Sequence, residues 1–319
     1  MSGETLLAMN TDFPDLLLLD IWLSGWDGRE ICKKLKKEEA SKETAPPKPP
    51  VAELWTVTEG IDTPESVYVE PASGDIYVSS VAGMPGDKDG KGSIAKISAD
   101  GKTVNAMFVT GLNAPKGLRS FEGTLWTTDI DEIVGIELAS GKVTSKTKVK
   151  GAQFLNDTAV GSDGTVYVSD MMGNKIIAFK GGKTSVFAEG EDLEYPNGLL
   201  VEGDSLVVGG WGKPEADFTT KVPGRLFKLD LKTKKKTLIT PEPSANIDGL
   251  ESDGKGGYIA TDYLAGKVLR ISSDGKITTL ATFMPSTADI AFIAADNKLI
   301  VPHMNENKIV AYDISGALQ

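Results

Sequence analysis

The feature that most constrains the fold is a repeat that occupies the chain from about residue 51 to its end. A short segment with a polar residue at its centre recurs six times, each time followed by similar apolar segments. The central residues are Glu65, Lys116, Asn156, Asn197, Asp248 and Asp289, separated by 51, 40, 41, 51 and 41 residues in a chain of 319. Such a period indicates that one supersecondary unit is built repeatedly and stacked against its own copies.

Each copy has the pattern of four short strands. In the third copy the central segment is followed by apolar strands at residues 166–168 and 176–179, and most copies add a fourth strand, such as residues 277–281. Four strands in each period predict an all-β fold, a six-bladed β-propeller over residues 51–319. The last copy lacks its fourth strand. We expect residues 54–58 to supply it, which closes the ring and leaves no open edge.

The residues before the repeat form two further zones. Residues 1–37 contain a short apolar stretch that ends at Asp20, and a helical pattern that opens at Asp27. Residues 38–50 are first charged and then rich in proline, a composition typical of a linker.

Composition excludes several classes of function. The chain has 45 acidic and 34 basic residues and a net charge of −11, which argues against nucleic acid and membrane surfaces as partners. With Cys32 and His303 as the sole residues of their types, an intramolecular disulfide, a thiolate zinc cluster and a multi-histidine site are excluded. A metal site here must use oxygen ligands.

The sequence as written lacks an export signal and an apolar run long enough to span a membrane. We therefore expect a cytoplasmic protein that acts on a small-molecule substrate. Whether it has a protein partner stays open.

The six central polar residues define a candidate site. Inner strands of a propeller converge on its axis, so residues at one register meet around the central channel. Glu65 and Asp248 with Asn156 and Asn197 offer carboxylate and amide oxygens, a set that suits Ca²⁺ best, with Mg²⁺, Mn²⁺ or Zn²⁺ as alternatives. Lys116 would balance charge or hold an anionic substrate group. The simpler alternative is that the Asn-Gly and Asp-Gly pairs are turns.

A second register lies at the ends of the second strands and contains His303. That histidine is a candidate proton shuttle, although strand-end residues also cap turns. Insertions at residues 82–92 and 211–224 follow second strands, so we expect them to border the same site as lids, with Trp211 as a substrate contact.

Residues 52–319 resemble the gluconolactonase and regucalcin family, six-bladed propellers with a metal in the central channel. The resemblance rests on Pro64-Glu65-Ser66-Val67, Asn197-Gly198 and Ile247-Asp248-Gly249. It implies that Glu65, Asn197 and Asp248 are metal ligands, that Asn156 contacts substrate or metal-bound water, and that Asp248 is a general base. Homologues of this family are often exported, which is the alternative localisation.

Two departures from known families matter. The family's substrate-binding arginine is replaced by Phe154, which makes a more apolar substrate plausible. Residues 14–28 resemble the middle of a response-regulator receiver domain, with Asp20 at the phosphoacceptor position, but the rest of that domain has no counterpart. We interpret this head as a non-functional fragment.

Two functions follow as hypotheses. The first is a metal-dependent hydrolase of lactones or related esters, in which the ion polarises the carbonyl, Asp248, Asn156 and His303 take part in catalysis, and Lys116, Phe154 and Trp211 contact substrate. The alternative is a non-catalytic propeller that binds a small ligand or a protein on its lid face.

Overall fold

The computed structural model describes residues 22–23, 26–27 and 50–318. The chain divides into two compact units, Met1–Pro49 and Pro50–Gln319. In the first unit, β1 (Trp22–Leu23) and β2 (Trp26–Asp27) form an antiparallel pair. Asp20, most of the receiver-like segment and most of the expected linker lie outside the described residues.

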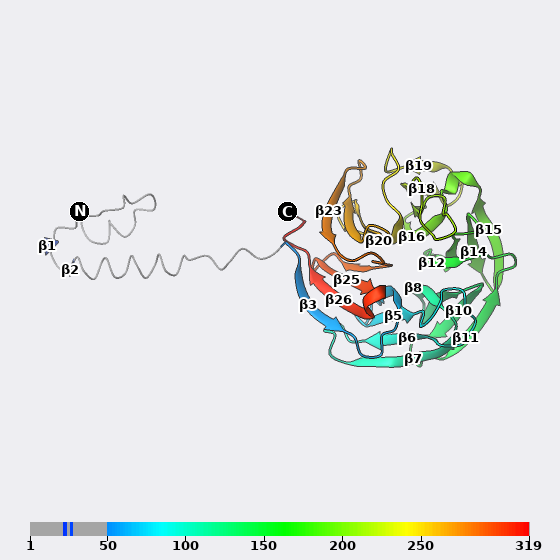
Figure 1. Ribbon diagram of the computed structural model, residues 1–319, viewed down its shortest axis with the longest axis horizontal. Helices are drawn as coiled ribbons and strands as arrows, with labels where there is room; N and C mark the ends of the chain where they lie inside the picture. Colours follow the sequence, from blue (N-terminus) through cyan, green and yellow to red (C-terminus); the bar gives the residue numbers. More distant parts are fainter. Residues whose placement is uncertain (1–21, 24–25, 28–49, 319) are drawn as a thin grey trace. The chain divides into compact units, whose positions relative to one another are not determined.

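Over residues 50–318 the chain forms six four-stranded antiparallel sheets arranged as the blades of a propeller (Figure 1). Blade 1 consists of β4 (Pro64–Val69), β5 (Ile76–Ser80), β6 (Gly92–Ile97) and β7 (Val104–Leu112). Blade 2 consists of β8 (Pro115–Phe121), β9 (Thr124–Asp129), β10 (Glu132–Glu137) and β11 (Val143–Lys148). Blade 3 consists of β12 (Leu155–Val160), β13 (Val166–Asp170), β14 (Lys175–Lys180) and β15 (Lys183–Glu189). Blade 4 consists of β16 (Pro196–Glu202), β17 (Ser205–Gly210), β18 (Leu226–Asp230) and β19 (Lys236–Leu238). Blade 5 consists of β20 (Ile247–Ser252), β21 (Tyr258–Asp262), β22 (Lys267–Ile271) and β23 (Ile277–Thr282). Blade 6 consists of β24 (Ala291–Ile293), β25 (Lys298–His303), β26 (Lys308–Asp313) and β3 (Ala52–Val57).

The ring closes as the repeat predicts. β3, the first strand of the propeller in the sequence, pairs antiparallel with β26, with Val57 opposite Ile309 and Ala52 opposite Asp313. In Figure 1 the blue strand β3 lies beside the red strand β26, so the two ends of the propeller sequence share one blade. The all-β fold and the six blades predicted from the repeat are confirmed. Two short 3-10 helices, η1 (Glu191–Leu193) and η2 (Met304–Glu306), lie between strands.

The hydrophobic core lies between the blades. Successive side chains of a strand point to opposite faces of its sheet. Each face of a blade packs against the face of the neighbouring blade, so apolar residues are buried on both faces. Tyr77 of blade 1 packs with Leu118 and Val134 of blade 2, and Trp126 of blade 2 contacts Phe179 of blade 3 edge-to-face. Each blade interface is therefore a separate apolar layer, and every blade depends on its two neighbours.

A bulge recurs in the inner strands at the central polar residue. The register against the second strand shifts at the same place in β4, β8, β12, β16 and β20. A β-bulge re-aims the side chain that it carries, and here it turns the polar residue toward the axis. The Asn197-Gly198 and Asp248-Gly249 pairs thus lie inside strands, so the turn alternative for them is wrong.

Glycine after the polar residue allows neighbouring inner strands to approach closely. A Cβ at Gly198 would lie 2.2 Å from the Asp248 carbonyl oxygen, and one at Gly249 would lie 2.6 Å from the Ile290 nitrogen. No side chain fits at either separation. Gly198 therefore sets the spacing between β16 and β20, the strands that carry Asn197 and Asp248.

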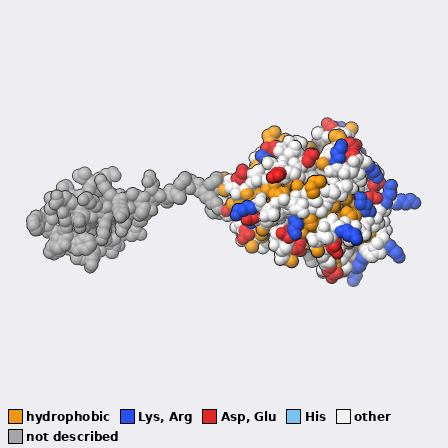
Figure 2. All heavy atoms as spheres, turned by 90° about the horizontal axis from the view of Figure 1, so that it is seen from below, with side chains coloured by type: hydrophobic (Ala, Val, Ile, Leu, Met, Phe, Trp, Pro, Cys, Tyr) orange, Lys and Arg blue, Asp and Glu red, His pale blue; other side chains and the backbone are white. Residues whose placement is uncertain are grey.

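The surface of the propeller carries charges of both signs. Acidic and basic side chains are interspersed over the side of the propeller shown in Figure 2, with hydrophobic side chains between them. Within the described residues, no helix has the length and apolar character needed to cross a bilayer.

Candidate functional site

A cavity of about 240 Å³ lies where the inner strands begin. The insertion at residues 211–224 contributes Asp217 to the polar lining of this cavity, and five inner strands contribute one residue each, a set that we call the floor: Glu65, Lys116, Asn156, Asn197 and Asp248. All five side chains are buried. The bulges described above bring together residues that are up to 183 positions apart, since the floor runs from position 65 to position 248.

The floor contains polar atoms that lack partners within the protein. Glu65 Oε2, Asp248 Oδ1 and both amide atoms of Asn197 are buried without a hydrogen-bond partner of good geometry, although the Asn197 amide lies near enough to Asp248 to lower the pKa of that carboxyl. Each such group costs about 1–3 kcal/mol when it is left unsatisfied. Lys116 and Asn156 have no such orphan atoms. Within the floor, the three residues with orphan oxygens are the three that the family resemblance implies as metal ligands; outside the floor, Asp289 Oδ1, Ser80 Oγ and Thr158 Oγ1 also lack partners.

Burial and like charges dominate the electrostatics of the floor. Burial raises the pKa of the Glu65 carboxyl well above its usual range, and the neighbouring Asp248 raises it further. Burial and the charge of Asp289 raise the pKa of Asp248 in the same direction. Burial lowers the pKa of Lys116, opposed by Glu65 and Asp129. The floor therefore disfavours its own negative charges and would be stabilised by a cation.

Asp289, the sixth residue of the predicted ring, does not line the cavity. Its carboxylate accepts a hydrogen bond from Ser66 Oγ at 2.5 Å, and its backbone NH donates to the Glu65 carbonyl at 3.0 Å. The inner strand of this blade, β24, begins only at Ala291. Asp289 is thus tied sideways to blade 1 and acts on the floor through its charge.

The walls of the cavity come from residues one position beyond the predicted second register, of which only Trp211 was predicted from the sequence. The second strands end at the predicted positions, but the residue immediately after each strand end lines the cavity. These residues, which we call the collar, are Val81, Met171, Trp211, Tyr263 and Met304. All are apolar or aromatic, and successive residues of an extended chain point to opposite sides. Apolar character shared at that register was the signal that could have revealed them.

His303 ends β25 and lies outside the cavity lining. Its Nε2 is 3.1 Å from the Tyr312 hydroxyl and its Nδ1 is 3.2 Å from Glu306, while its ring packs edge-to-face on Phe283. Burial lowers the pKa of this histidine. These contacts give His303 a packing role in blade 6, and a catalytic role for it has no support from the geometry.

The other strand-end carboxylates hold the loops that precede the inner strands. Asp170 accepts hydrogen bonds from the backbone NH groups of Gln153 and Phe154, and Asp129 accepts them from Asn113 and Ala114. Asp170 thereby positions Phe154, which lines the cavity just before β12. Both aspartates therefore cap turns, which was the alternative to a catalytic role for strand-end residues.

The insertion at residues 211–224 covers part of the cavity as expected for a lid. Its Phe218 lies 5.6 Å from Phe154 between ring centroids, and its Trp211 lies 5.4 Å from Tyr263. The insertion at residues 82–92 contributes Pro85 to the lining. Both lids therefore border the same site.

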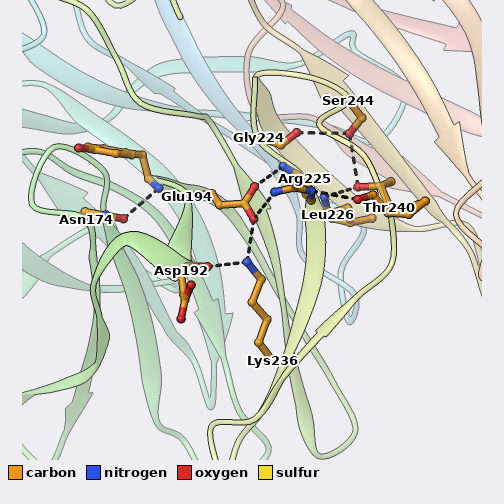
Figure 3. Close-up of polar contacts among 11 residues, drawn as sticks. Asn174, Asp192, Glu194, Gly224, Arg225, Leu226, Lys236, Thr240 and Ser244 are labelled. Carbon is orange, nitrogen blue, oxygen red and sulfur yellow. Dashed lines mark hydrogen bonds and ion pairs between the residues drawn. The ribbon is translucent and has the colours of Figure 1, made fainter. Parts of the chain in front are cut away.

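A charged cluster anchors the base of the larger lid (Figure 3). Glu194 accepts hydrogen bonds from the backbone NH and Nη1 of Arg225, and from Nζ of Lys236 at 2.7 Å. The Glu194 carbonyl accepts from Gly212 and the Tyr195 carbonyl accepts from Trp211. Both ends of the lid are thus bound to the segment that leads into β16, the strand of Asn197.

A hydrogen bond between an arginine and a glutamate crosses the channel beyond the floor. Arg119, three residues after Lys116 on β8, donates through Nη2 to Glu251 Oε1 at 2.9 Å, and Glu251 lies three residues after Asp248 on β20. These strands belong to blades 2 and 5, with two other blades between them. Burial, with the charge of Asp289, raises the pKa of Glu251 from 4.5 to about 7 against the opposing charge of Arg119.

This raised pKa predicts a loss of stability with rising pH. The folded protein holds the Glu251 proton up to about pH 7, whereas the unfolded chain releases it near pH 4.5, so stability from this group falls across that window. We expect Glu251→Gln, which keeps the acceptor for Arg119, to reduce this fall by about 2 kcal/mol, allowing for a side chain that is 19% exposed. The measurement is urea unfolding with EDTA at pH 5 and pH 8.

Glu202→Gln is the matched control for that experiment. Glu202 bonds to Lys228 and Tyr258, and its pKa is lowered chiefly by Lys228. Glu202→Gln should therefore have a lower free energy of unfolding than the wild type at pH 8, whereas the change for Glu251→Gln at that pH has the opposite sign. An unchanged pH dependence in Glu251→Gln would contradict the buried, protonated state.

The described residues contain no cluster of three or more histidine, cysteine, aspartate or glutamate side chains arranged to hold a metal ion. The floor offers two such carboxylates, Glu65 and Asp248, and completes the set with the Asn197 amide. A metal here would therefore depend on amide and water oxygens as well as carboxylates, a set that fits a hard cation.

The fold and the cavity define the protein as a six-bladed β-propeller with a polar floor and an apolar collar around a cavity at the start of its inner strands. No protein-family model matches the sequence, and no curated protein matches it.

Solved structures share the fold at low sequence identity. A gluconolactonase from Xanthomonas campestris is similar with a TM-score of 0.59 and 15% identity, over 82% of this chain and 91% of that one. An inactive virginiamycin B lyase from Staphylococcus aureus, solved with quinupristin, has a TM-score of 0.55 and 16% identity over 82% and 98%. An auxiliary nutrient binding protein from Bacteroides ovatus has a TM-score of 0.59 and 12% identity over 79% and 69%. These likenesses establish the propeller, and their different roles leave the function to the site.

Proposed function

We propose that this protein is a metal-dependent hydrolase of lactones or related esters, with a divalent ion held on the floor by Glu65, Asn197 and Asp248. Ca²⁺ is the best fit, with Mg²⁺, Mn²⁺ and Zn²⁺ as alternatives, because the donors are carboxylate and amide oxygens. The observation that carries the proposal is the set of buried, unpartnered oxygens on these three residues.

The charge balance of the channel supports a cation. Glu65 and Asp248 face a single floor cation, Lys116, and the buried Asp157 and Asp289 add negative charge nearby that Arg119 offsets in part. Burying unpaired carboxylates is costly, and a bound divalent ion removes that cost. The likeness in fold to a gluconolactonase adds support for this class of reaction.

The chemistry divides between the ion and the chain. A divalent ion supplies a Lewis acid that polarises the ester carbonyl and stabilises negative charge on its oxygen. Asp248 acts as the general base that takes a proton from the attacking water. Asn156, buried on the floor beside these groups, orients the water or the substrate through its amide. Lys116 holds positive charge near Glu65 and limits repulsion among the acids.

The experiment measures metal and turnover together on the purified full chain. We expect near-stoichiometric divalent metal by mass spectrometry, hydrolysis of at least one lactone in a panel, loss of hydrolysis with EDTA, and recovery when the metal returns. Hydrolysis that resists EDTA in metal-free protein would refute the proposal. Stoichiometric ligand binding without turnover across the panel would favour the ligand-binding propeller instead.

A further inference from the structure

We infer that the cavity selects an uncharged ligand whose reactive polar group meets the floor and whose apolar substituent, aromatic or alkyl, fills the collar beneath the larger lid. This inference rests on the proposed function and names its substrate class: lactones or esters with an apolar substituent rather than polyhydroxylated or anionic ones.

The collar presents mostly apolar surface because nearly all of its polar groups already have partners. Trp211 Nε1 donates to the Phe218 carbonyl at 3.1 Å, and the Tyr263 hydroxyl lies 3.6 Å from Met304 Sδ as a donor. Asn246 donates to the Trp211 carbonyl at 2.6 Å and to Thr220 Oγ1. Of the collar side chains only Tyr263 keeps a free acceptor, its hydroxyl oxygen, so a ligand hydroxyl placed elsewhere on the collar would lose its water without finding a partner, which costs about 1–3 kcal/mol for each group.

The aromatic pairs form two sides of this apolar subsite. Phe154 precedes β12 and Phe218 comes from the lid, while Trp211 and Tyr263 belong to the collar. Their ring separations of 5.6 and 5.4 Å are those of packed aromatic pairs, so both sides are formed without a ligand. Asp170 and Asn246 fix the two segments through backbone bonds. Such a preformed subsite binds an apolar group at small entropic cost.

The cavity disfavours anions. Its buried lysine, Lys116, already donates to the carbonyls of Ala114 at 3.0 Å and Pro85 at 3.2 Å, and its Nζ lies 4.7 Å from the centre of the Phe154 ring. A divalent ion on the floor would neutralise Glu65 and Asp248, so the lack of a free cationic donor is what disfavours an anion. Lys116 therefore does not offer the open fork or free ammonium that anion recognition uses.

The size of the cavity limits the substituent. About 240 Å³ is just below the range of about 300–1,000 Å³ for drug-sized ligands. One five- or six-membered lactone with a single ring or a short alkyl chain is the scale that fits.

Two δ-lactams that cannot be hydrolysed test the inference by isothermal titration calorimetry, with the metal-loaded full chain. One carries a phenyl substituent and the other carries the hydroxyl groups of glucose. We expect the phenyl lactam to bind at least about 30-fold more tightly. Equal or tighter binding of the polyhydroxylated lactam, or binding of neither, would overturn the inference.

A pair of lid variants locates the effect. Phe218→Ala should weaken phenyl-lactam binding about tenfold and leave the polyhydroxylated lactam unchanged. Val222→Ala, an exposed position of the same insertion, should change neither. Equal affinity of wild type and Phe218→Ala for the phenyl lactam would overturn the inference.

Failure of the inference and failure of the proposed function give different results. Tight phenyl-lactam binding without hydrolysis of any lactone refutes the hydrolase and supports the apolar subsite. Metal-dependent hydrolysis with preference for the polyhydroxylated lactone and lactam supports the hydrolase and refutes the apolar subsite.

Discussion

Asp248→Ala is expected to lower kcat/KM for lactone hydrolysis by at least about 1,000-fold and to abolish stoichiometric metal binding. The substitution removes one of the two floor carboxylates, and with it both a metal ligand and the proposed general base. A positioned general base contributes about 100- to 10,000-fold, and loss of the ion removes several kcal/mol of transition-state stabilisation in addition. Steady-state kinetics and metal analysis of the purified variant measure both effects.

Asp217→Ala is the matched control, because Asp217 also lines the cavity but lies on the lid. Its carboxylate accepts hydrogen bonds from Thr219 within the same loop, so we expect metal content to be retained and kcat/KM to change less than tenfold. If Asp248→Ala kept full, EDTA-resistant activity, the metal-assisted mechanism would be wrong.

Gly198→Ala is expected to destabilise the propeller by about 3 kcal/mol or more and to impair the site at the same time. The added Cβ would lie 2.2 Å from the Asp248 carbonyl oxygen, a backbone atom that cannot move without shifting β20. Overpacking of this kind costs about 1–3 kcal/mol, and more where the obstructing atom is rigid. Urea unfolding measures the free-energy change, and lactone kinetics measure the displacement of Asp248.

Gly86→Ala provides the comparison for that variant. Gly86 lies in the smaller insertion with no atom within 4 Å of an added Cβ, and its backbone is not in the left-handed region. We expect its free energy of unfolding to stay within about 0.5 kcal/mol of the wild type. Equal stability of the Gly198 and Gly86 variants would show that the inner strands can separate freely, contrary to the close approach seen here.

The predictability of this site follows from the repeat. Glu65, Asn156, Asn197 and Asp248 share one register, so their convergence on the axis was predictable once the period was recognised. Lys116 lies at the same register and also lines the floor. Asp289 fits the register but departs from the floor, because its bond to Ser66 and the late start of β24 depend on contacts between blades 6 and 1.

The walls were less predictable, because a one-residue offset reverses the direction of a side chain. His303, the sole histidine, was the predicted proton shuttle, whereas the neighbouring Met304 lines the cavity. The same offset separates Asp262 from Tyr263 and Asp170 from Met171. The position of Phe218 could not be predicted from the repeat, because the insertion that contains it has no counterpart in the other blades. Its packing against Phe154 depends on the folded lid.

The number of blades, the closing strand and five of the six ring residues follow from the sequence alone, since the repeat period and the alternation of side chains along strands predict them. The tertiary structure alone decided which side chains form the walls, that Gly198 is a spacer between strands rather than a turn residue, and that Arg119 meets Glu251 across the channel. Those features depend on distances between separate blades, and packing of the closed ring sets these distances.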